Sequence, residues 1–97
     1  MNYVIRLEDE AKEDAAEIIL YLSQFYENTP LRFEAALKRE LRLLAFSPGG
    51  ARYEPKPEYR KCVFYNDYVM FYSVDENTKT VRIERIFHGS QDIQNII

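Results

Sequence analysis

The most informative segment of the sequence is VFYNDYVMFYSV, residues 63–74. Aromatic and β-branched residues, which favour strands, fill both of its halves, and the dipeptide Asn66-Asp67 between them is a turn signal. The alternation of polar or small residues with apolar ones continues upstream of this segment. We therefore predict a β-hairpin whose two strands span 60–65 and 68–74.

The regions on either side of this hairpin have different characters. On the carboxyl side, a second turn over 75–79 leads into a strand over 80–87, and a terminal segment over 91–97 has weak helical character. On the amino side, residues 48–58 contain three of the four prolines and two of the three glycines. This composition predicts a loop.

Two amphipathic helices are predicted before this loop. Asp9 is the expected N-cap of the first helix, which ends near Glu27. Thr29 caps the second helix, and Pro30 occupies its first position, where no backbone N–H is needed. The predicted apolar stripes comprise Ala11, Ala15, Ile18, Ile19, Leu22 and Phe25/Tyr26 in the first helix, and Phe33, Ala36/Leu37, Leu41 and Leu44 in the second.

A short strand over residues 3–7 precedes the helices, so the predicted order is β-α-α-β-β-β-α. Consecutive helices joined by a short break form a hairpin, and neighbouring strands joined by tight turns are antiparallel. The expected fold is therefore α+β, with the helical hairpin packed on one face of a small, mainly antiparallel sheet. At 97 residues, the chain is expected to form a single domain, 1–97.

The composition narrows the class of protein. With 46% hydrophobic residues and only 3 Gly, the chain is too apolar for disorder. The single Cys62 cannot form an intramolecular disulfide, and the amino terminus lacks the plan of a secretory signal, so a cytoplasmic location is expected. No apolar stretch approaches the roughly 20 residues of a membrane span, and no membrane partner is expected.

Charge is distributed unevenly along the chain, whose net charge is −3. Residues 1–30 hold seven acids against two bases, whereas residues 31–64 hold eight bases against four acids. A nucleic-acid binder usually concentrates Lys and Arg on one face, because neutralising phosphates supplies most of its affinity. Here such a face would be small on an acidic molecule, so direct binding to nucleic acid is not favoured.

Neither a metal site nor a cofactor is expected. One Cys and one His lack the ligand clusters of zinc sites, and there is no Gly-rich phosphate loop. Ser90, His88 and Asp92 contain the residue types of a catalytic triad, but three such residues within five positions are more typical of a turn with a capping serine.

The last predicted strand contains unusual positions. Strict alternation puts Val81, Ile83, Arg85 and Phe87 on one face, so that Arg85 interrupts apolar residues. We expect either a structural ion pair with a nearby carboxylate or a role in contacting a target. His88 either stabilises the turn through a hydrogen bond or transfers protons, since histidine titrates nearest neutrality.

A further basic pair, Arg60-Lys61, opens the first hairpin strand. It is either a strand end protected by charge or a contact site.

The order of elements, the hairpin 63–74 and the ending VRIERIFHGSQDI, residues 81–93, resemble the RelE/ParE superfamily of toxins from type II toxin–antitoxin modules. The His-Gly-x-x-Asp motif after the last strand is the most specific element, and the resemblance extends from Tyr3 to Ile93. It implies cytoplasmic expression beside a cognate antitoxin that wraps and masks the toxin. It also implies a dimer or a toxin–antitoxin heterotetramer.

ParE-like members resemble this chain in their paired helices and His-Gly-x-x-Asp ending. The resemblance implies growth arrest by binding DNA gyrase, without catalytic residues. The target-contact candidates are Arg60, Lys61, Arg82 and Arg85.

RelE-like members cleave mRNA on the translating ribosome, which is the alternative implication. Arg60, Lys61 and Arg85 would then steady the phosphate, and His88 would move the proton. Val69 stands where this pattern has an arginine, and Gln91 often corresponds to arginine too, so the nuclease set is incomplete. A third alternative is an inactive member that only binds its antitoxin.

Overall fold

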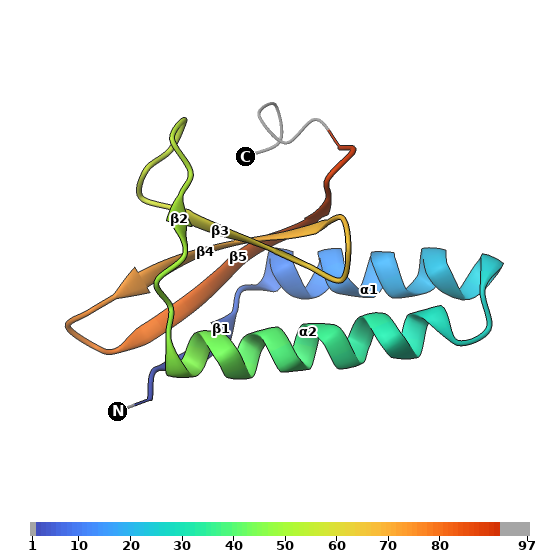
Figure 1. The fold of residues 1–97 in the computed structure, drawn as a ribbon, viewed down its shortest axis with the longest axis horizontal. Helices are drawn as coiled ribbons and strands as arrows, with labels where there is room; N and C mark the ends of the chain where they lie inside the picture. Colours follow the sequence, from blue (N-terminus) through green and yellow to red (C-terminus); the bar gives the residue numbers. More distant parts are fainter. Residues whose placement is uncertain (1, 92–97) are drawn as a thin grey trace.

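A helical hairpin covers one face of a five-stranded sheet in the computed structural model, which describes residues 2–91 (Figure 1). The elements are β1 (Val4–Leu7), α1 (Asp9–Phe25), α2 (Thr29–Phe46), β2 (Ala51–Arg52), β3 (Arg60–Phe64), β4 (Tyr68–Asp75) and β5 (Thr80–His88). The predicted α+β architecture is confirmed. Of the terminal segment predicted as weakly helical, 92–97 lie outside the described residues.

The sheet has the order β1-β5-β4-β3-β2, and only the β1–β5 pair is parallel. It is therefore mainly antiparallel, as predicted. The prediction of a loop throughout 48–58 is wrong at one place, because β2 pairs Ala51 with Lys61 and Arg52 with Arg60. Two residues are too few to show an alternating pattern, so β2 depends on β3 for its strand conformation.

Both helices begin one residue earlier than predicted. Asp9 and Thr29 are the first helical residues, and Glu8 and Asn28 take the N-cap positions without a side-chain capping hydrogen bond. The backbone N–H of Glu8 instead donates to Ile83 O, 3.0 Å away, which holds the residue before α1 against β5. Tertiary contact, and not a capping side chain, sets this helix start.

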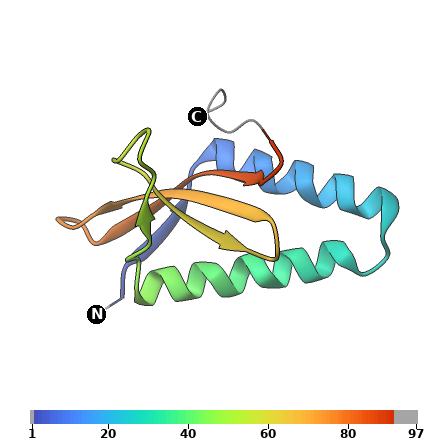
Figure 2. The ribbon, with the colours of Figure 1, turned by 45° about the horizontal axis from the view of Figure 1, so that its top comes forward.

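Most of the predicted apolar stripe on both helices packs against the sheet. Ala11 and Ala15 leave room for α1 to lie close to β5, while Phe33 of α2 meets the ring of Tyr68 at a centroid distance of 4.9 Å. Phe25 at the end of α1 and Tyr26, which follows it, are exposed. They were predicted in the stripe, but the hairpin tip projects beyond the strands, as Figure 1 and Figure 2 show.

Strict alternation along β5 is also wrong, because the register shifts within the strand. Ile83 pairs with Tyr72, but Phe71 pairs with Arg85, so Glu84 is an extra residue in β5. This β-bulge changes which residues share a face. Ile86 therefore joins the helix-side core together with Val81 and Ile83.

The opposite face of the sheet carries a second cluster, made of Tyr53, Phe71 and Phe87. The rings of Tyr53 and Phe71 meet edge-on at 5.0 Å. The Tyr53 hydroxyl is buried and has no hydrogen-bond partner within residues 2–91. The bulge places Phe87 in this cluster. Strict alternation had assigned Phe87 to the face of Val81.

Neither described helix is long and apolar enough to cross a membrane.

Candidate functional site

A groove of about 640 Å³ lies between α1 and the carboxyl end of β5, and we call it the α1–β5 groove. It forms because β1 pairs only with residues 80–83, which leaves the rest of this edge of β5 beside α1. Its lining comprises Asp14, Glu17, Ile18, Tyr21, Leu22, Tyr26, Tyr68, Arg85, Ile86, Phe87, His88, Ser90 and Gln91. Apolar side chains are thus mixed with hydroxyl, carboxylate and basic groups.

Asp14 and Arg85 form a two-point ion pair in the groove. Arg85 donates from Nε to Asp14 Oδ2 at 2.8 Å and from Nη2 to Oδ1 at 3.0 Å. The two side chains are 22% and 12% exposed, for Arg85 and Asp14 respectively. The hydrogen bonds that Arg85 donates to Asp14 raise the pKa of the guanidinium above its ordinary value. The structural ion pair, one of the two expectations for Arg85, is present.

Asp14 also completes the edge of β5. The backbone N–H of Ile86 donates to Asp14 Oδ2 at 2.9 Å, at a point where β1 has already ended. A side chain from α1 therefore supplies the acceptor that a longer neighbouring strand would have provided.

His88 lies at the rim of the groove and stabilises the turn that follows β5. Its Nδ1 lies 2.6 Å from Ser90 Oγ, and the backbone N–H of Ser90 donates to the same nitrogen at 3.2 Å. The His88 backbone N–H donates to the side chain of Gln91 at 2.8 Å. The expected turn hydrogen bond is therefore present. Asp92, the third residue of the triad considered from the sequence, lies outside the described residues.

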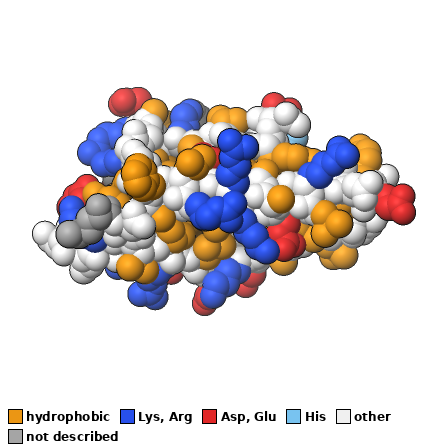
Figure 3. Space-filling model, turned by 60° about the horizontal axis from the view of Figure 1, so that its bottom comes forward, with side chains coloured by type: hydrophobic (Ala, Val, Ile, Leu, Met, Phe, Trp, Pro, Cys, Tyr) orange, Lys and Arg blue, Asp and Glu red, His pale blue; other side chains and the backbone are white. Residues whose placement is uncertain are grey.

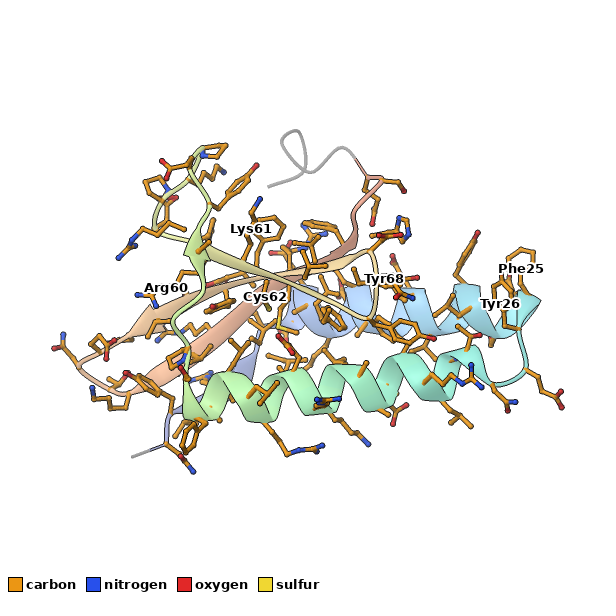
Figure 4. The ribbon with its side chains drawn as sticks, viewed as in Figure 1. Phe25, Tyr26, Arg60, Lys61, Cys62 and Tyr68 are labelled. Carbon is orange, nitrogen blue, oxygen red and sulfur yellow. The ribbon has the colours of Figure 1, made fainter. Side chains whose placement is uncertain are left out.

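Tyr68 links His88 to the core. The His88 ring meets the Tyr68 ring edge-on at 5.1 Å, and burial raises the pKa of the Tyr68 phenol. Tyr68 and Tyr26 are labelled in Figure 4. From the sequence, Tyr26 was predicted in the apolar stripe of the first helix and Tyr68 at the start of a strand, and only the tertiary arrangement shows that both line a groove with Tyr21. The high tyrosine content, 8 of 97 residues, was the sequence feature that could have pointed to a tyrosine-lined site.

Arg60 and Lys61 lie away from this groove, on opposite faces of β3 (Figure 4). Arg60 donates from Nη1 to Pro48 O at 2.8 Å, whereas the Lys61 ammonium lies 6.0 Å from the centre of the Tyr53 ring. Lys61, Phe71 and Arg85 form one row across three strands. With neighbouring strands about 4.8 Å apart, the backbones of Lys61 and Arg85 are separated by about 10 Å.

The structure does not bring all four nuclease candidates together. Arg85 and His88 share the α1–β5 groove. Arg60 and His88 pair with residues of β4 that are four positions apart, Tyr72 and Tyr68, which puts their backbones on the order of 15 Å apart across the sheet.

Arg82, the remaining contact candidate, is partly exposed and lies 3.7 Å from Glu8, measured from Nε to Oε1. This is a loose ion pair between accessible side chains.

Cys62 is not an activated thiol. Burial, with a smaller contribution from the charge of Glu40 and a hydrogen bond to it, raises its pKa to about 12. Within residues 2–91 no three His, Cys, Asp or Glu side chains gather in a way that could hold a metal ion.

Comparison with known proteins places this geometry among bacterial toxins. Residues 5–93 match the family model described as the ParE toxin of the type II toxin–antitoxin system parDE. No curated protein sequence matches the chain significantly.

Solved structures share the fold at low sequence identity. The chromosomal ParDE system of P. aeruginosa superposes with a TM-score of 0.71 at 17% identity, covering 89% of this chain and 95% of that one. The RelBE2 toxin–antitoxin complex of Mycobacterium tuberculosis gives 0.62 at 17% identity, covering 91% and 99%. A free double mutant of E. coli RelE gives 0.63 at 14% identity, covering 100% of both chains.

Proposed function

Because the chain belongs to the ParE toxin family of type II toxin–antitoxin systems, we propose that it arrests bacterial growth by binding DNA gyrase when no antitoxin masks it. In this mechanism the chain cuts no RNA and needs no cofactor. Its contribution is a surface that binds and traps the target enzyme. Of the four candidate contacts, Lys61 and Arg82 are accessible to a partner, whereas Arg85 is held by Asp14 and Arg60 by Pro48 O.

The ion pairing and burial of Arg85 favour gyrase binding over RNA cleavage. Its guanidinium is held by both oxygens of Asp14 and is mostly buried. Steadying a phosphate in a transition state requires positively charged groups preorganised around one point. Arg85 is already neutralised by a carboxylate, and Arg60 and Lys61 lie elsewhere on the sheet. A mechanism based on protein contact does not need these groups to converge.

A cognate antitoxin is the second partner that we propose. Two of the similar structures are toxin–antitoxin systems, which supports this partner. The α1–β5 groove offers apolar side chains and tyrosine hydroxyls, and masking it would cover His88 and the accessible end of β5. Toxin and antitoxin would then form a heterotetramer or a smaller complex in the cytoplasm.

Ribosome-dependent cleavage of mRNA is the alternative function, and one observation favours it. Arg85 and His88 line the same groove, and the His88 ring is oriented by Ser90 and Tyr68. A histidine and a guanidinium that line one groove supply a proton-transfer group and a positive charge for chemistry at a phosphate.

The deciding experiment induces the chain without antitoxin in a bacterial host and maps the 5′ ends of its mRNAs soon afterwards. In parallel, the purified chain is added to gyrase in a supercoiling assay. We expect growth arrest and loss of supercoiling without new mRNA ends. Codon-phased ends would replace the gyrase proposal with the nuclease. Unchanged growth and supercoiling, with antitoxin binding retained, would identify an inactive member.

The variant His88→Ala separates the two active mechanisms, because its ring is needed only for cleavage. It should still arrest growth and inhibit gyrase, provided that circular dichroism shows a native fold. Lys61→Glu should weaken gyrase inhibition, whereas Arg32→Glu, an equal charge change on the helical layer, should leave it unchanged. A folded His88→Ala variant that loses both RNA cleavage and toxicity would overturn the gyrase proposal.

A further inference from the structure

The outward face of α2 carries positive charge that the molecule itself does not neutralise. Arg32, Arg39 and Arg42 are exposed, and no carboxylate within residues 2–91 forms an ion pair with any of them. Lys38 differs, since it pairs with Glu34 at 3.1 Å. Figure 3 shows Lys and Arg side chains gathered over the middle of this face, among apolar side chains.

Apolar side chains lie on the same face of α2. Leu31 and Phe46, at opposite ends of the helix, are 69% and 77% exposed. Steps of three and four residues connect Leu31, Ala35, Arg39, Arg42 and Phe46, so they form one stripe along the helix. We call this stripe the basic face. Its combination of large apolar and unpaired basic side chains fits a partner helix that is both apolar and acidic.

The adjacent helix of the same chain has these properties. Glu13 and Glu17 of α1 are exposed and form no ion pair within the described chain, and Leu20 is exposed beside them. Glu10 is not available in the same way, because its carboxylate lies 3.4 Å from Arg85. Glu13, Glu17 and Leu20 follow one another at helical spacing and form what we call the acidic face.

The charged residues of the acidic face and the basic face lie at similar distances from the tip of the helical hairpin. At 1.5 Å per residue, Glu13 lies about 18 Å from the tip end of α1, and Arg42 lies about 20 Å from the tip end of α2. Glu17 and Arg39 lie about 12 and 15 Å from the same ends. Two acids and two bases therefore occur at nearly equal levels on neighbouring antiparallel helices.

We propose that two copies of this chain associate face to face through their helical hairpins, with α1 of each copy lying on α2 of the other. Rotation about a two-fold axis parallel to the helices does not change how far any residue lies from the hairpin tip. It places α1 of one copy opposite α2 of the other. Glu13 then meets Arg42 of the second copy, and Glu17 meets its Arg39. The symmetry repeats both contacts and so gives four ion pairs, and Leu20 meets Ala35 of the second copy on the side of these pairs nearer the hairpin tip.

A second copy explains the observations better than a nucleic acid does. A polyanion on the basic face would also approach Glu13 and Glu17 on the neighbouring helix, and the whole chain has a net charge of −3. Exposed ion pairs are individually weak and are screened by salt. The dimer should therefore dissociate on dilution and at high ionic strength. This association does not depend on the toxin's target.

Sedimentation equilibrium of the antitoxin-free chain tests the proposal over a wide concentration range. At low salt and high concentration we expect twice the monomer mass of 11.6 kDa, with dissociation at high salt. Variant A is Arg39→Glu with Arg42→Glu, and variant B is Glu13→Arg with Glu17→Arg. Each variant alone places like charges opposite each other, so each should stay monomeric.

Mixing the two variants provides the decisive measurement. In a dimer of one A and one B chain, acids again face bases on both sides of the axis, so the equimolar mixture should dimerise. Arg6→Glu, an exposed charge reversal on β1, is the control that should dimerise like the natural chain. Thermal unfolding followed by circular dichroism confirms that all variants fold.

Three results would overturn the proposal. The first is a monomer at all concentrations in low salt. The second is a dimer that persists in variants A and B, because its interface would lie elsewhere. The third is a mixture of A and B that stays monomeric. If the natural chain is monomeric and binds a labelled single-stranded RNA, and variant A does not bind this RNA, the basic face would be assigned to nucleic acid instead.

Discussion

Asp14 joins α1 to β5 through its carboxylate. Its carboxylate accepts hydrogen bonds from the guanidinium of Arg85 and from the backbone of Ile86. Removing one partner of a buried, hydrogen-bonded pair leaves the other desolvated and unpaired, which costs more than the pair itself contributes.

We therefore expect Asp14→Asn to lower the free energy of unfolding by about 2–4 kcal/mol, because the amide cannot replace both charged acceptors. Urea unfolding followed by circular dichroism measures the change. Glu10→Gln is the matched control. Its carboxylate also faces Arg85 but is 73% exposed, so the loss should stay below about 1 kcal/mol. Equal losses in the two variants would contradict the role assigned to Asp14.

Cys62 supplies a prediction about pH. Its pKa is raised to about 12 from an ordinary value of 9.0, mainly by burial. Only the thiolate reacts with iodoacetamide, so near pH 8 the folded protein should be alkylated about a thousand times more slowly than the urea-unfolded chain. Glu40→Gln removes a neighbouring negative charge and should speed alkylation of the folded protein. Equal rates in the folded and unfolded chains would contradict the raised pKa.

The same shift predicts the sign of one contribution to alkaline stability. Below pH 9 the Cys62 thiol keeps its proton in both the folded and the unfolded chain. Between pH 9 and about 12 the unfolded chain loses this proton and the folded chain retains it. Stability should therefore fall as pH rises above 9, and the fall should be less steep in Cys62→Ala. Parallel urea-unfolding series of the two proteins measure the difference.

At the scale of the elements, the bulge in β5 decides which residues reach the core. Glu84 is the extra residue between Ile83, opposite Tyr72, and Arg85, opposite Phe71. Deleting Glu84 should preserve both pairings and keep Ile86 facing the helices. We expect a cooperatively folded protein that is less stable by about 1–2 kcal/mol, since the Ser73–Glu84 hydrogen bond is also lost.

Deletion of Met70 is the matched comparison for this prediction. It removes a paired residue of β4, so every following side chain of that strand would move to the other face. This variant should not unfold cooperatively in urea. Failure of both deletion variants to fold would show that the bulge itself is needed for the strand to curve towards α1.

At the scale of the whole molecule, we expect the stability of this 97-residue chain to respond strongly to a bound partner. A ligand that binds only the folded state at a hundred times its dissociation constant stabilises it by about 2.7 kcal/mol. For a domain of this size, the cognate antitoxin should raise the unfolding temperature by about 10 °C or more. Calorimetry with a non-cognate antitoxin as the control tests this; equal shifts would argue against a specific complex.

The charge asymmetry visible in the sequence also acts at this scale. An excess of acids in 1–30 and of bases in 31–64 becomes an acidic α1 beside a basic α2. The tertiary structure places both helices in one layer, where their outward faces can meet a second copy. The asymmetry is visible in the sequence, but the proposed interface depends on the tertiary placement of the two helices in one layer.

The sequence by itself determined the helical hairpin, the β3–β4 hairpin and the mainly antiparallel sheet. These features depend on periodicity and turn residues within short windows, as Asn66-Asp67 illustrates. It also singled out Arg85 and His88, because a cation on an apolar strand and a lone histidine are locally conspicuous.

Only the tertiary structure decided how these residues are used. Asp14 and Arg85 are 71 positions apart, and their pairing depends on α1 crossing the edge of β5 where β1 ends. The bulge at Glu84 and the two-residue β2 arise from pairing with neighbouring strands, which leaves no local pattern. Long-range register therefore grouped Arg85 with His88 in one groove and left Arg60 and Lys61 outside it.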